Sequence, residues 1–374
     1  MNKIPLAKPY VGDEEIAAVT EVIKSGMLSL GPKLKEFETN FAQLVGTKHA
    51  IAVNSGTSGL HLCLKAIGIK PGDEVITASF SFVASSNPII FEGATPIFVD
   101  IDEKTYNMDP EKLKQAITEK TKAIIPVHMF GQPCNMDAIM EIANEKNIPV
   151  IEDACEALEA TWDGKKAGTF GNSAVVAFYP NKQMTTGEGG IILTDDDNVA
   201  ELCKSYRNQG RDESGQWLNH IRIGYNYRLD EMSCAMGVEQ LKKVDFIINK
   251  RKEIAAKYTK KLEGIEGIIL PYVDPKADST WFVYSLRTAE GINRNKMVEY
   301  LNENGVGSKA YFYPPIHLQP IYKEMFGSNE GDFPVTEKIS NTAFILPFFT
   351  ELTDEQINTV CSVVEEAVRK CKND

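Results

Sequence analysis

The chain has no uninterrupted apolar run of the length that a membrane-spanning helix needs, and its first residues lack the apolar segment of a secretory signal. Its seven cysteines form no Cys-x-x-Cys pair, which is a common spacing in zinc and redox sites. They are odd in number and mostly lie in apolar segments, which is typical of reduced, packed thiols. We therefore predict a cytoplasmic protein with no membrane partner and no metal site.

An excess of basic residues is also absent. The 40 lysines and arginines are outnumbered by 52 aspartates and glutamates, which gives a formal net charge of −12. A nucleic-acid-binding protein needs a basic stripe that displaces counterions from phosphates, so nucleic acid is not expected as a partner. An anionic small substrate is compatible with this composition if basic side chains or backbone amides gather locally around it.

Neither internal repeats nor low-complexity linkers interrupt the sequence. Its 374 residues exceed what one hydrophobic core usually serves and predict two or three domains. In the first half, short β-branched runs alternate with amphipathic helical segments, which is the pattern of parallel strands joined by helices. Helices are predicted at 13–25 and 33–45, and strands at 50–54, 74–78, 96–100, 123–127, 149–152 and 174–178.

The second half begins with a long helical pattern. Apolar residues recur at helical spacing from 229 to 262, and we interpret this stretch as a bridge between domains. Beyond it, 281–287 alternates like a strand, while 294–304 and 353–369 have helical periodicity. We therefore predict a large α/β domain at residues 1–240 and a smaller C-terminal α+β domain at residues 241–374.

Turn-forming and small polar residues surround Lys182 in the segment Ala-Phe-Tyr-Pro-Asn-Lys-Gln-Met-Thr-Thr-Gly-Glu-Gly-Gly, residues 177–190. A lysine amine is a nucleophile when it is neutral, and an apolar, aromatic-lined site favours the neutral form because the ammonium is costly to desolvate. On this segment alone, a solvated surface lysine is the more ordinary interpretation.

An apolar strand ends at Asp153, within Ile-Pro-Val-Ile-Glu-Asp-Ala-Cys-Glu, residues 148–156. Ligands of α/β sheets bind at the carboxyl ends of the strands, which suits a functional carboxylate at this point. Asp153 could equally cap a helix, and Glu156 could be its capping-box partner.

Small hydroxyl and glycine residues stand between a predicted strand and a helix in Val-Asn-Ser-Gly-Thr-Ser-Gly-Leu, residues 53–60. A helix start offers unpaired amides and the positive end of the helix dipole, and a glycine lets the backbone approach a phosphate. Many such turns have no ligand, and the Walker pattern of nucleoside triphosphatases is missing. A phosphate-binding turn at Gly56, Thr57 and Ser58, a strand-end aspartate and a lysine together form the set that pyridoxal phosphate requires.

Ordered motifs run through nearly the whole chain: Leu-Gly-Pro (30–32), Ser-Gly-Thr (55–57), Glu-Gly-Ala-Thr-Pro (92–96), Glu-Asp-Ala (152–154), residues 182–190, Gly-Tyr-Asn-Tyr-Arg (224–228) and His-Leu-Gln-Pro (317–320). By these motifs the chain resembles the sugar aminotransferases of the DegT/DnrJ/EryC1/StrS family. The resemblance implies the type I, aspartate aminotransferase-like fold of pyridoxal-phosphate enzymes, with a large, mostly parallel sheet domain and a smaller C-terminal α+β domain.

The resemblance also assigns roles around the cofactor. Lys182 would bind the cofactor covalently, Asp153 would pair with its pyridine nitrogen, and Gly56, Thr57 and Ser58 would hold its phosphate. Phe82 would stack on the cofactor ring, although it could equally be a core aromatic. Glu156 falls near the ring hydroxyl, where glutamine or histidine is more frequent, and Ala177 replaces a frequent serine, so one phosphate contact would be missing.

Further roles concern the substrate and a second subunit. Asn226 matches an asparagine that reaches the phosphate from the neighbouring subunit, which implies a homodimer with shared active sites. Arg228 would face the anionic substrate, or it could make a structural ion pair. The stretch 311–317, including Tyr313 and His317, would form the sugar-side wall, although His317 could equally be a structural histidine between domains.

The predicted function is pyridoxal-phosphate-dependent transfer of an amino group, from glutamate, onto a keto carbon of a nucleotide-linked sugar. A cyclitol aminotransferase of the same family is an alternative. A sugar dehydratase, in which histidine replaces the lysine, and a non-catalytic sensor or scaffold are two more, and the presence of Lys182 and Asp153 speaks against them.

Overall fold

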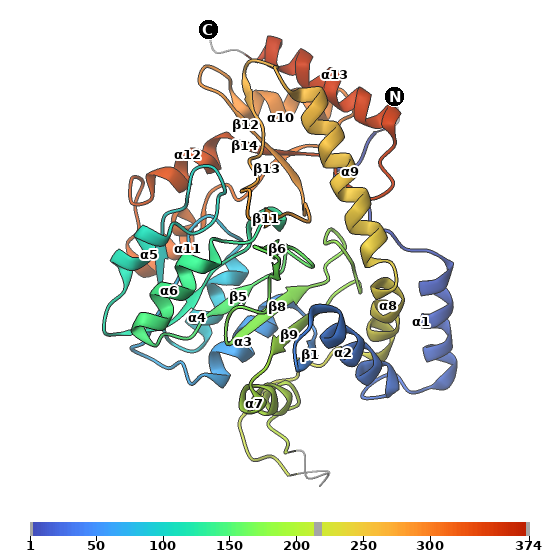
Figure 1. Ribbon diagram of the computed structural model, residues 1–374, viewed down its shortest axis with the longest axis vertical. Helices are drawn as coiled ribbons and strands as arrows, with labels where there is room; N and C mark the ends of the chain where they lie inside the picture. The colour runs from blue at the N-terminus through green and yellow to red at the C-terminus, as the bar shows by residue number, and fades with distance from the viewer. Residues whose placement is uncertain (1–2, 213–218, 372–374) are drawn as a thin grey trace.

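A mixed sheet forms the centre of the protein, described here from a computed structural model for residues 3–212 and 219–371 (Figure 1). One part of the sheet has the strand order β3-β2-β4 and the other β5-β8-β9-β1. Parallel bridges from Ile124 to Val150 and from Val127 to Asp153 join β4 to β5 and make the sheet continuous. The strands are β1 (His49–Val53), β2 (Glu74–Ala78), β3 (Thr95–Val99), β4 (Thr121–Ile125), β5 (Ile151–Asp153), β8 (Ser173–Ala177) and β9 (Gly190–Thr194).

Most neighbouring strands of this sheet are parallel. β2 pairs in parallel with β3 and β4, and β5 pairs in parallel with β8, whereas β9 runs antiparallel to both β8 and β1. The predicted α/β fold with a mostly parallel sheet is thereby confirmed, and each predicted strand overlaps an observed one. β9 was missed because glycines at 187, 189 and 190 lead into it, and glycine is depleted in strands.

Helices cover both faces of the sheet because successive side chains of a strand point to opposite faces. In β1, Ile51 and Val53 face a core covered by α3 (Gly56–Ala66) and α7 (Asp197–Arg207). Ala50 and Ala52 face the other core, which α2 (Pro32–Val45) and α8 (Glu231–Leu241) cover. The other helices of this half are α1 (Asp13–Ser25), α4 (Asn87–Phe91), α5 (Pro110–Ala116) and α6 (Met136–Lys146), so the two helices predicted there are confirmed as α1 and α2.

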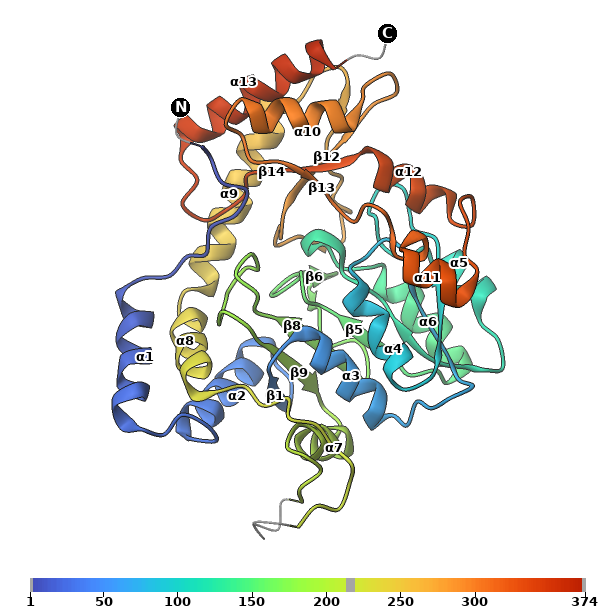
Figure 2. The same ribbon diagram turned by 180° about the vertical axis from the view of Figure 1, so that it is seen from behind.

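The helical stretch predicted from 229 to 262 consists of two helices, α8 and α9 (Val244–Leu262), interrupted at Lys242. The first part of α9, with Ile248, packs in a core of the large sheet, and its last part, with Tyr258, packs in the C-terminal core. Figure 2 shows α9 running from α8 to the C-terminal elements. α9 therefore connects the two cores.

The C-terminal core is built on an antiparallel sheet of order β10-β12-β14-β13. Ile4 pairs with Val306 and packs in this core, so the start of the chain lies beside α13 at this end of the molecule (Figure 1). The division into residues 1–240 and 241–374 stays a prediction. The elements are β10 (Ile268–Ile269), β12 (Tyr284–Thr288), α10 (Arg294–Glu303), β13 (Lys309–Ala310), α11 (Pro320–Phe326), α12 (Pro334–Thr342), β14 (Ala343–Leu346) and α13 (Asp354–Lys370), with a small separate sheet of β11 (Ala277–Asp278), β6 (Thr161–Trp162) and β7 (Lys165–Lys166).

A buried carboxylate, Glu231, holds the start of α2 from a distant point of the chain. Its two oxygens accept hydrogen bonds from the backbone amides of Lys33, at 2.8 Å, and Leu34, at 2.9 Å. Amides in the first turn of a helix have no partner within the helix, and the helix dipole favours a negative charge there. Gly31 leaves room for the carboxylate, because a Cβ at this position would lie 2.6 Å from Glu231 Oε2.

Replacing this carboxylate should destabilise the fold. Glu231→Gln is expected to lower the free energy of unfolding by about 1–3 kcal/mol, because the amide loses the charge and turns an NH2 group toward one amide donor. Urea unfolding followed by circular dichroism measures this change. Glu239→Gln on the same helix is the control: its carboxylate pairs with the exposed Lys242 at 2.7 Å, so a change under about 0.5 kcal/mol is expected. Equal changes in both variants would contradict the capping role.

Candidate active site

The carboxyl ends of β5 and β8 meet the start of α3 at two glycines. A Cβ on Gly56 would lie 2.9 Å from Cys155 Sγ and 3.0 Å from Ala177 Cβ. A Cβ on Gly190, at the start of β9, would lie 2.7 Å from the carbonyl carbon of Ser55 and 2.8 Å from the Gly56 nitrogen. A larger residue at either position would push α3 away from the sheet. The first turn of α3 is therefore fixed beside the ends of both strands.

The start of α3 has the features of an anion site. Ser55 caps the helix, and its hydroxyl accepts a hydrogen bond from the Ser58 amide at 3.1 Å. A backbone bond from the Gly59 amide to the Ser55 carbonyl opens the helix, so the amides of Gly56 and Thr57 precede it. Such amides, together with the positive end of the helix dipole, suit a phosphate at the turn that the sequence predicts.

Asp153 is the last residue of β5 and is buried. Its Oδ1 accepts a hydrogen bond from the Cys155 amide at 3.2 Å, and its Oδ2 accepts one from the Ser85 hydroxyl at 2.7 Å. Turns follow β5 at residues 155–156 and 158–159. The alternative interpretations of Asp153 as a helix cap and of Glu156 as its capping-box partner are therefore wrong.

Lys182 follows β8 in a turn that its amide closes by a 2.9 Å bond to the Tyr179 carbonyl. The side chain is only 14% exposed, so it is not a solvated surface lysine. Its Nζ lies 3.4 Å from Glu156 Oε1 and 4.0 Å from the centroid of the Phe282 ring. The amine therefore has a carboxylate on one side and an aromatic face on the other.

Glu156 is the second buried carboxylate of the site. Its Oε2 accepts a hydrogen bond from the Phe130 amide at 3.0 Å, and its backbone carbonyl accepts one from the side chain of Gln183. Burial raises the pKa of Glu156, the charge of Asp153 adds to this rise, and Lys182 opposes it. The carboxyl group of Glu156 can therefore hold a proton at higher pH than an exposed glutamate does.

The C-terminal half of the chain closes one side of the site. The Phe282 amide donates to the Phe130 carbonyl at 2.9 Å, and this contact holds the Phe282 ring against Lys182. Tyr311 packs against Phe130 with ring centroids 5.5 Å apart. Burial raises the pKa of the Tyr311 hydroxyl, and the charge of Glu156 raises it further. Tyr311 also packs against the Phe282 ring, with centroids 6.2 Å apart.

Two residues predicted for the sugar-side wall make other contacts. Tyr313 is half exposed, and its ring lies 4.6 Å from the guanidinium of Arg294. His317 is fully buried, with Nδ1 2.6 Å from Ser79 Oγ and Nε2 3.2 Å from Glu337 Oε1. Because both ring nitrogens are occupied within the protein, the contacts of His317 are those of a structural histidine.

Phe82 lies on the loop between β2 and α4, and 62% of its surface is exposed. Its alternative interpretation as a core aromatic is therefore wrong. Its neighbours on this loop, Ser81 and Ser85, are buried. The loop thus presents one aromatic side chain from an otherwise packed segment.

Asn226 and Arg228 lie on a segment that runs along the carboxyl end of β1, where Val53 pairs with Arg228. Asn226 is exposed, and Arg228 donates from NH1 to Asn208 Oδ1 at 2.9 Å. Burial lowers the pKa of Arg228, and the positive charge of Arg211 lowers it further. Basic side chains therefore gather here in an otherwise acidic chain.

Sequence reasoning missed two residues that contact the predicted site: Ser85, which binds Asp153, and Phe282, whose ring faces Lys182. Ser85 stands in the same segment as Phe82, but side-chain direction could not be read from the sequence. Phe282 is the second residue of the predicted strand 281–287 and carries no motif.

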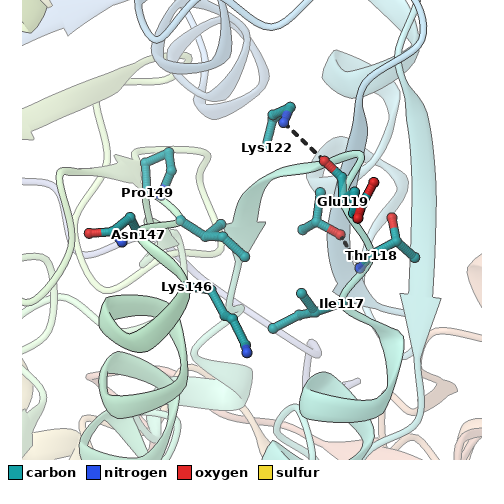
Figure 3. A pocket seen from close by; sticks show the side chains of 9 residues that line it. Ile117, Thr118, Glu119, Lys122, Lys146, Asn147 and Pro149 are labelled. Carbon is teal, nitrogen blue, oxygen red and sulfur yellow. Dashed lines mark hydrogen bonds between the residues drawn. The ribbon is translucent and has the colours of Figure 1, made fainter.

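A cavity of about 530 Å³ lies at the opposite ends of the strands, near the starts of β4 and β5 (Figure 3). Its wall includes Thr118, Lys122, Lys146 and Asn147. Lys122 donates to the carbonyl of Glu119 at 3.0 Å, as the dashed line in Figure 3 shows. This cavity is separate from Asp153, which lies at the carboxyl end of β5.

Known proteins resemble this chain along nearly its whole length. The DegT/DnrJ/EryC1/StrS aminotransferase family matches residues 9–365. GDP-perosamine synthase from Caulobacter vibrioides is 38% identical over 98% of this chain and 99% of its own. The structure of DesV from S. venezuelae superposes with a TM-score of 0.92 at 34% identity, over 98% of this chain and 99% of DesV.

A further structure, Spr1654 from Streptococcus pneumoniae in its PLP form, has a TM-score of 0.93 at 27% identity and covers 98% of this chain and 99% of its own. The predicted family, enzyme class and cofactor are thereby confirmed. The chain belongs to the DegT/DnrJ/EryC1/StrS family of pyridoxal-phosphate-dependent aminotransferases.

Proposed function

We propose that this aminotransferase moves an amino group from glutamate onto a keto carbon of a nucleotide-linked sugar. The observation that carries the proposal is the Lys182 amine, which lies 3.4 Å from Glu156, a buried carboxyl group that the charge of Asp153 also reaches. The name of the relative GDP-perosamine synthase refers to a nucleotide-linked sugar, which supports this substrate class.

The side chains of the site fit pyridoxal phosphate. When bound, the cofactor supplies an aldehyde that combines with amines and a ring that withdraws electrons from the adjacent carbon. Lys182 provides the amine for covalent attachment. Asp153 can hold a proton on the pyridine nitrogen, since its carboxylate only accepts hydrogen bonds. The amides of Gly56 and Thr57 would bind the phosphate, and the exposed Phe82 would be available to stack on the ring.

With the cofactor bound, Lys182 would have a second task. Its amine would move a proton to and from the reacting carbon, a step that requires the neutral amine. Glu156 lies 3.4 Å from this amine, and burial raises the pKa of its carboxyl group. Phe282 holds the amine in place by its ring face.

The site is completed by a second copy of the chain. Ile221 and Ile223, on the segment before Asn226, are 51% and 88% exposed, and a neighbouring subunit would cover such apolar side chains. This supports a homodimer in which Asn226 and Arg228 serve the partner's site. Arg228 then binds the anionic part of the nucleotide-linked sugar.

The enzyme is placed in the cytoplasm. Among residues 3–212 and 219–371, no helix combines the length and the apolar character that crossing a bilayer requires. All seven cysteines carry free thiols, which persist in a reducing compartment.

A screen of keto nucleotide-sugars with nitrogen-15-labelled glutamate tests the function. A nucleotide-linked amino sugar that carries the label is expected and is detected by mass spectrometry. Transfer to keto cyclitols alone would favour the cyclitol aminotransferase. No transfer to any keto acceptor, by enzyme that holds its cofactor, would contradict the proposal.

Removing the lysine should remove the covalent bond to the cofactor. Lys182→Ala is expected to lose the visible absorbance of the lysine–cofactor linkage and all turnover, because Lys182 is proposed as the one attachment point. Lys242→Ala, which removes a 62% exposed side chain just after α8, is the control and should match the wild type. Unchanged absorbance of the linkage in the Lys182 variant would contradict the assignment.

Neutralising the aspartate should uncouple binding from catalysis. Asp153→Asn is expected to keep the fold and the cofactor but to lower kcat by at least about 100-fold, since an amide cannot keep the pyridine nitrogen protonated. Steady-state kinetics with a cofactor titration measures both effects. Asp137→Asn, which removes an exposed partner of Lys276, is the control. Near wild-type kcat in Asp153→Asn would argue against the proposed role.

Mixed dimers test whether Asn226 and Arg228 act across the interface. A Lys182→Ala subunit paired with an Asn226→Ala, Arg228→Ala subunit is expected to regain one complete site from two inactive parents. Differently tagged subunits, exchanged and purified as heterodimers, show the recovery as activity of up to about half the wild-type value per dimer. Confirmed heterodimers without activity would mean that both residues serve their own subunit.

A further inference from the structure

Ser85 binds Asp153 from a different part of the sheet. Ser85 ends a short 3-10 helix (Val83–Ser85) between β2 and α4, and its hydroxyl donates to Asp153 Oδ2 at 2.7 Å. Ser85 is 1% exposed and Asp153 5% exposed, so water does not compete for this bond. A hydroxyl–carboxylate bond in such surroundings is stronger than one at the surface.

The direction of the hydrogen bonds follows from proton counting. The Ser85 hydroxyl has one proton, and the ionised Asp153 can only accept, so this proton lies between them. The Ser81 hydroxyl lies 2.8 Å from Ser85 Oγ and must therefore donate to it. The result is a chain from Ser81 to Ser85 to Asp153, in which each bond strengthens the next.

The loop that carries this chain is held at both ends by the C-terminal half. The Ser79 hydroxyl contacts the ring of His317 at 2.6 Å, and the Ser86 hydroxyl contacts the Tyr322 hydroxyl at 2.6 Å. Both contacts are buried. Ser85 therefore has a fixed position from which to orient the carboxylate.

We propose that Ser85 is a positioning residue, which sets the orientation of the Asp153 carboxylate toward the pyridine nitrogen. The inference rests on the proposed role of Asp153. With Oδ1 bound to the Cys155 amide and Oδ2 to Ser85, the plane of the carboxylate is fixed before the cofactor binds.

The orientation of the carboxylate decides how well it can serve the pyridine nitrogen. Hydrogen bonds are strongest when donor and acceptor are well aligned. A carboxylate held by Ser85 would face the protonated nitrogen and hold the proton there. Without the Ser85 hydroxyl, the carboxylate would be free to turn and would hold this proton less well.

The test measures the protonation of the pyridine nitrogen directly. Holoenzyme is prepared with cofactor labelled with nitrogen-15 in the ring, and the resonance of the label reports whether this nitrogen carries a proton. In Ser85→Ala, we expect the resonance to move from the wild-type position toward that of Asp153→Asn. We also expect a loss in the rate of amino transfer on the order of 10-fold, the typical effect of removing one bond to a charged group.

Two further variants separate positioning from packing. Ser85→Thr keeps the hydroxyl and should restore the wild-type resonance. Ser86→Ala removes an equally buried hydroxyl one position away, which contacts Tyr322 instead of Asp153, and should leave the resonance unchanged. If Ser85→Ala does not fold, Ser85→Cys, with its weaker donor, provides the same comparison.

The outcomes distinguish the two proposals. A shifted resonance in Asp153→Asn together with a wild-type resonance in Ser85→Ala overturns the role of Ser85 and leaves that of Asp153 intact. A wild-type resonance in Asp153→Asn overturns the role of Asp153 itself. Equal shifts in Ser85→Ala and Ser86→Ala would show a general packing effect and would also overturn the inference.

Discussion

The direct backbone contact between β9 and the first turn of α3 sets the geometry on which the candidate site depends. Gly190 and Gly56 carry no side chain at the two positions where one would separate these segments. Gly190 also pairs with Ala177 across the sheet, so the loop between them, with Lys182, must leave β8 and return beside the start of α3. Backbone packing therefore sets the distance between Lys182 and the phosphate-binding amides, and this distance can vary little.

A chain with a net charge of −12 must still bind an anionic cofactor, and backbone groups supply much of what is needed. The amides at the start of α3 are available for a phosphate, while the amides of Phe130 and Cys155 bind the buried carboxylates Glu156 and Asp153. Buried carboxylates are tolerated when their oxygens are hydrogen-bonded. An acidic surface and an anion-binding site are thus compatible, because the local field comes from oriented amides as well as from basic side chains.

The parts of the fold and site that the sequence predicts are those specified by neighbouring residues. Strand ends, helix starts and the turn around Lys182 depend on local patterns, and in the structure Lys182 lies beside Glu156, as predicted residues of one site. Contacts between distant segments leave no such pattern. Ser85 reaches Asp153 across 68 positions, and Phe282 reaches Lys182 from the C-terminal half. His317 likewise contacts Ser79 and Glu337. The residues around His317 in the sequence do not indicate these contacts.

Helix α9 is a rigid connection between the two cores. Its 19 residues span roughly 28 Å at about 1.5 Å per residue, and its sequence has neither proline nor glycine, so it resists bending. Phe282, which precedes β12, packs in a core with Ile76 and Ile124 of the large sheet. The helix and this packing together hold the C-terminal half against the large sheet. The Phe282 ring therefore keeps its place against the Lys182 amine.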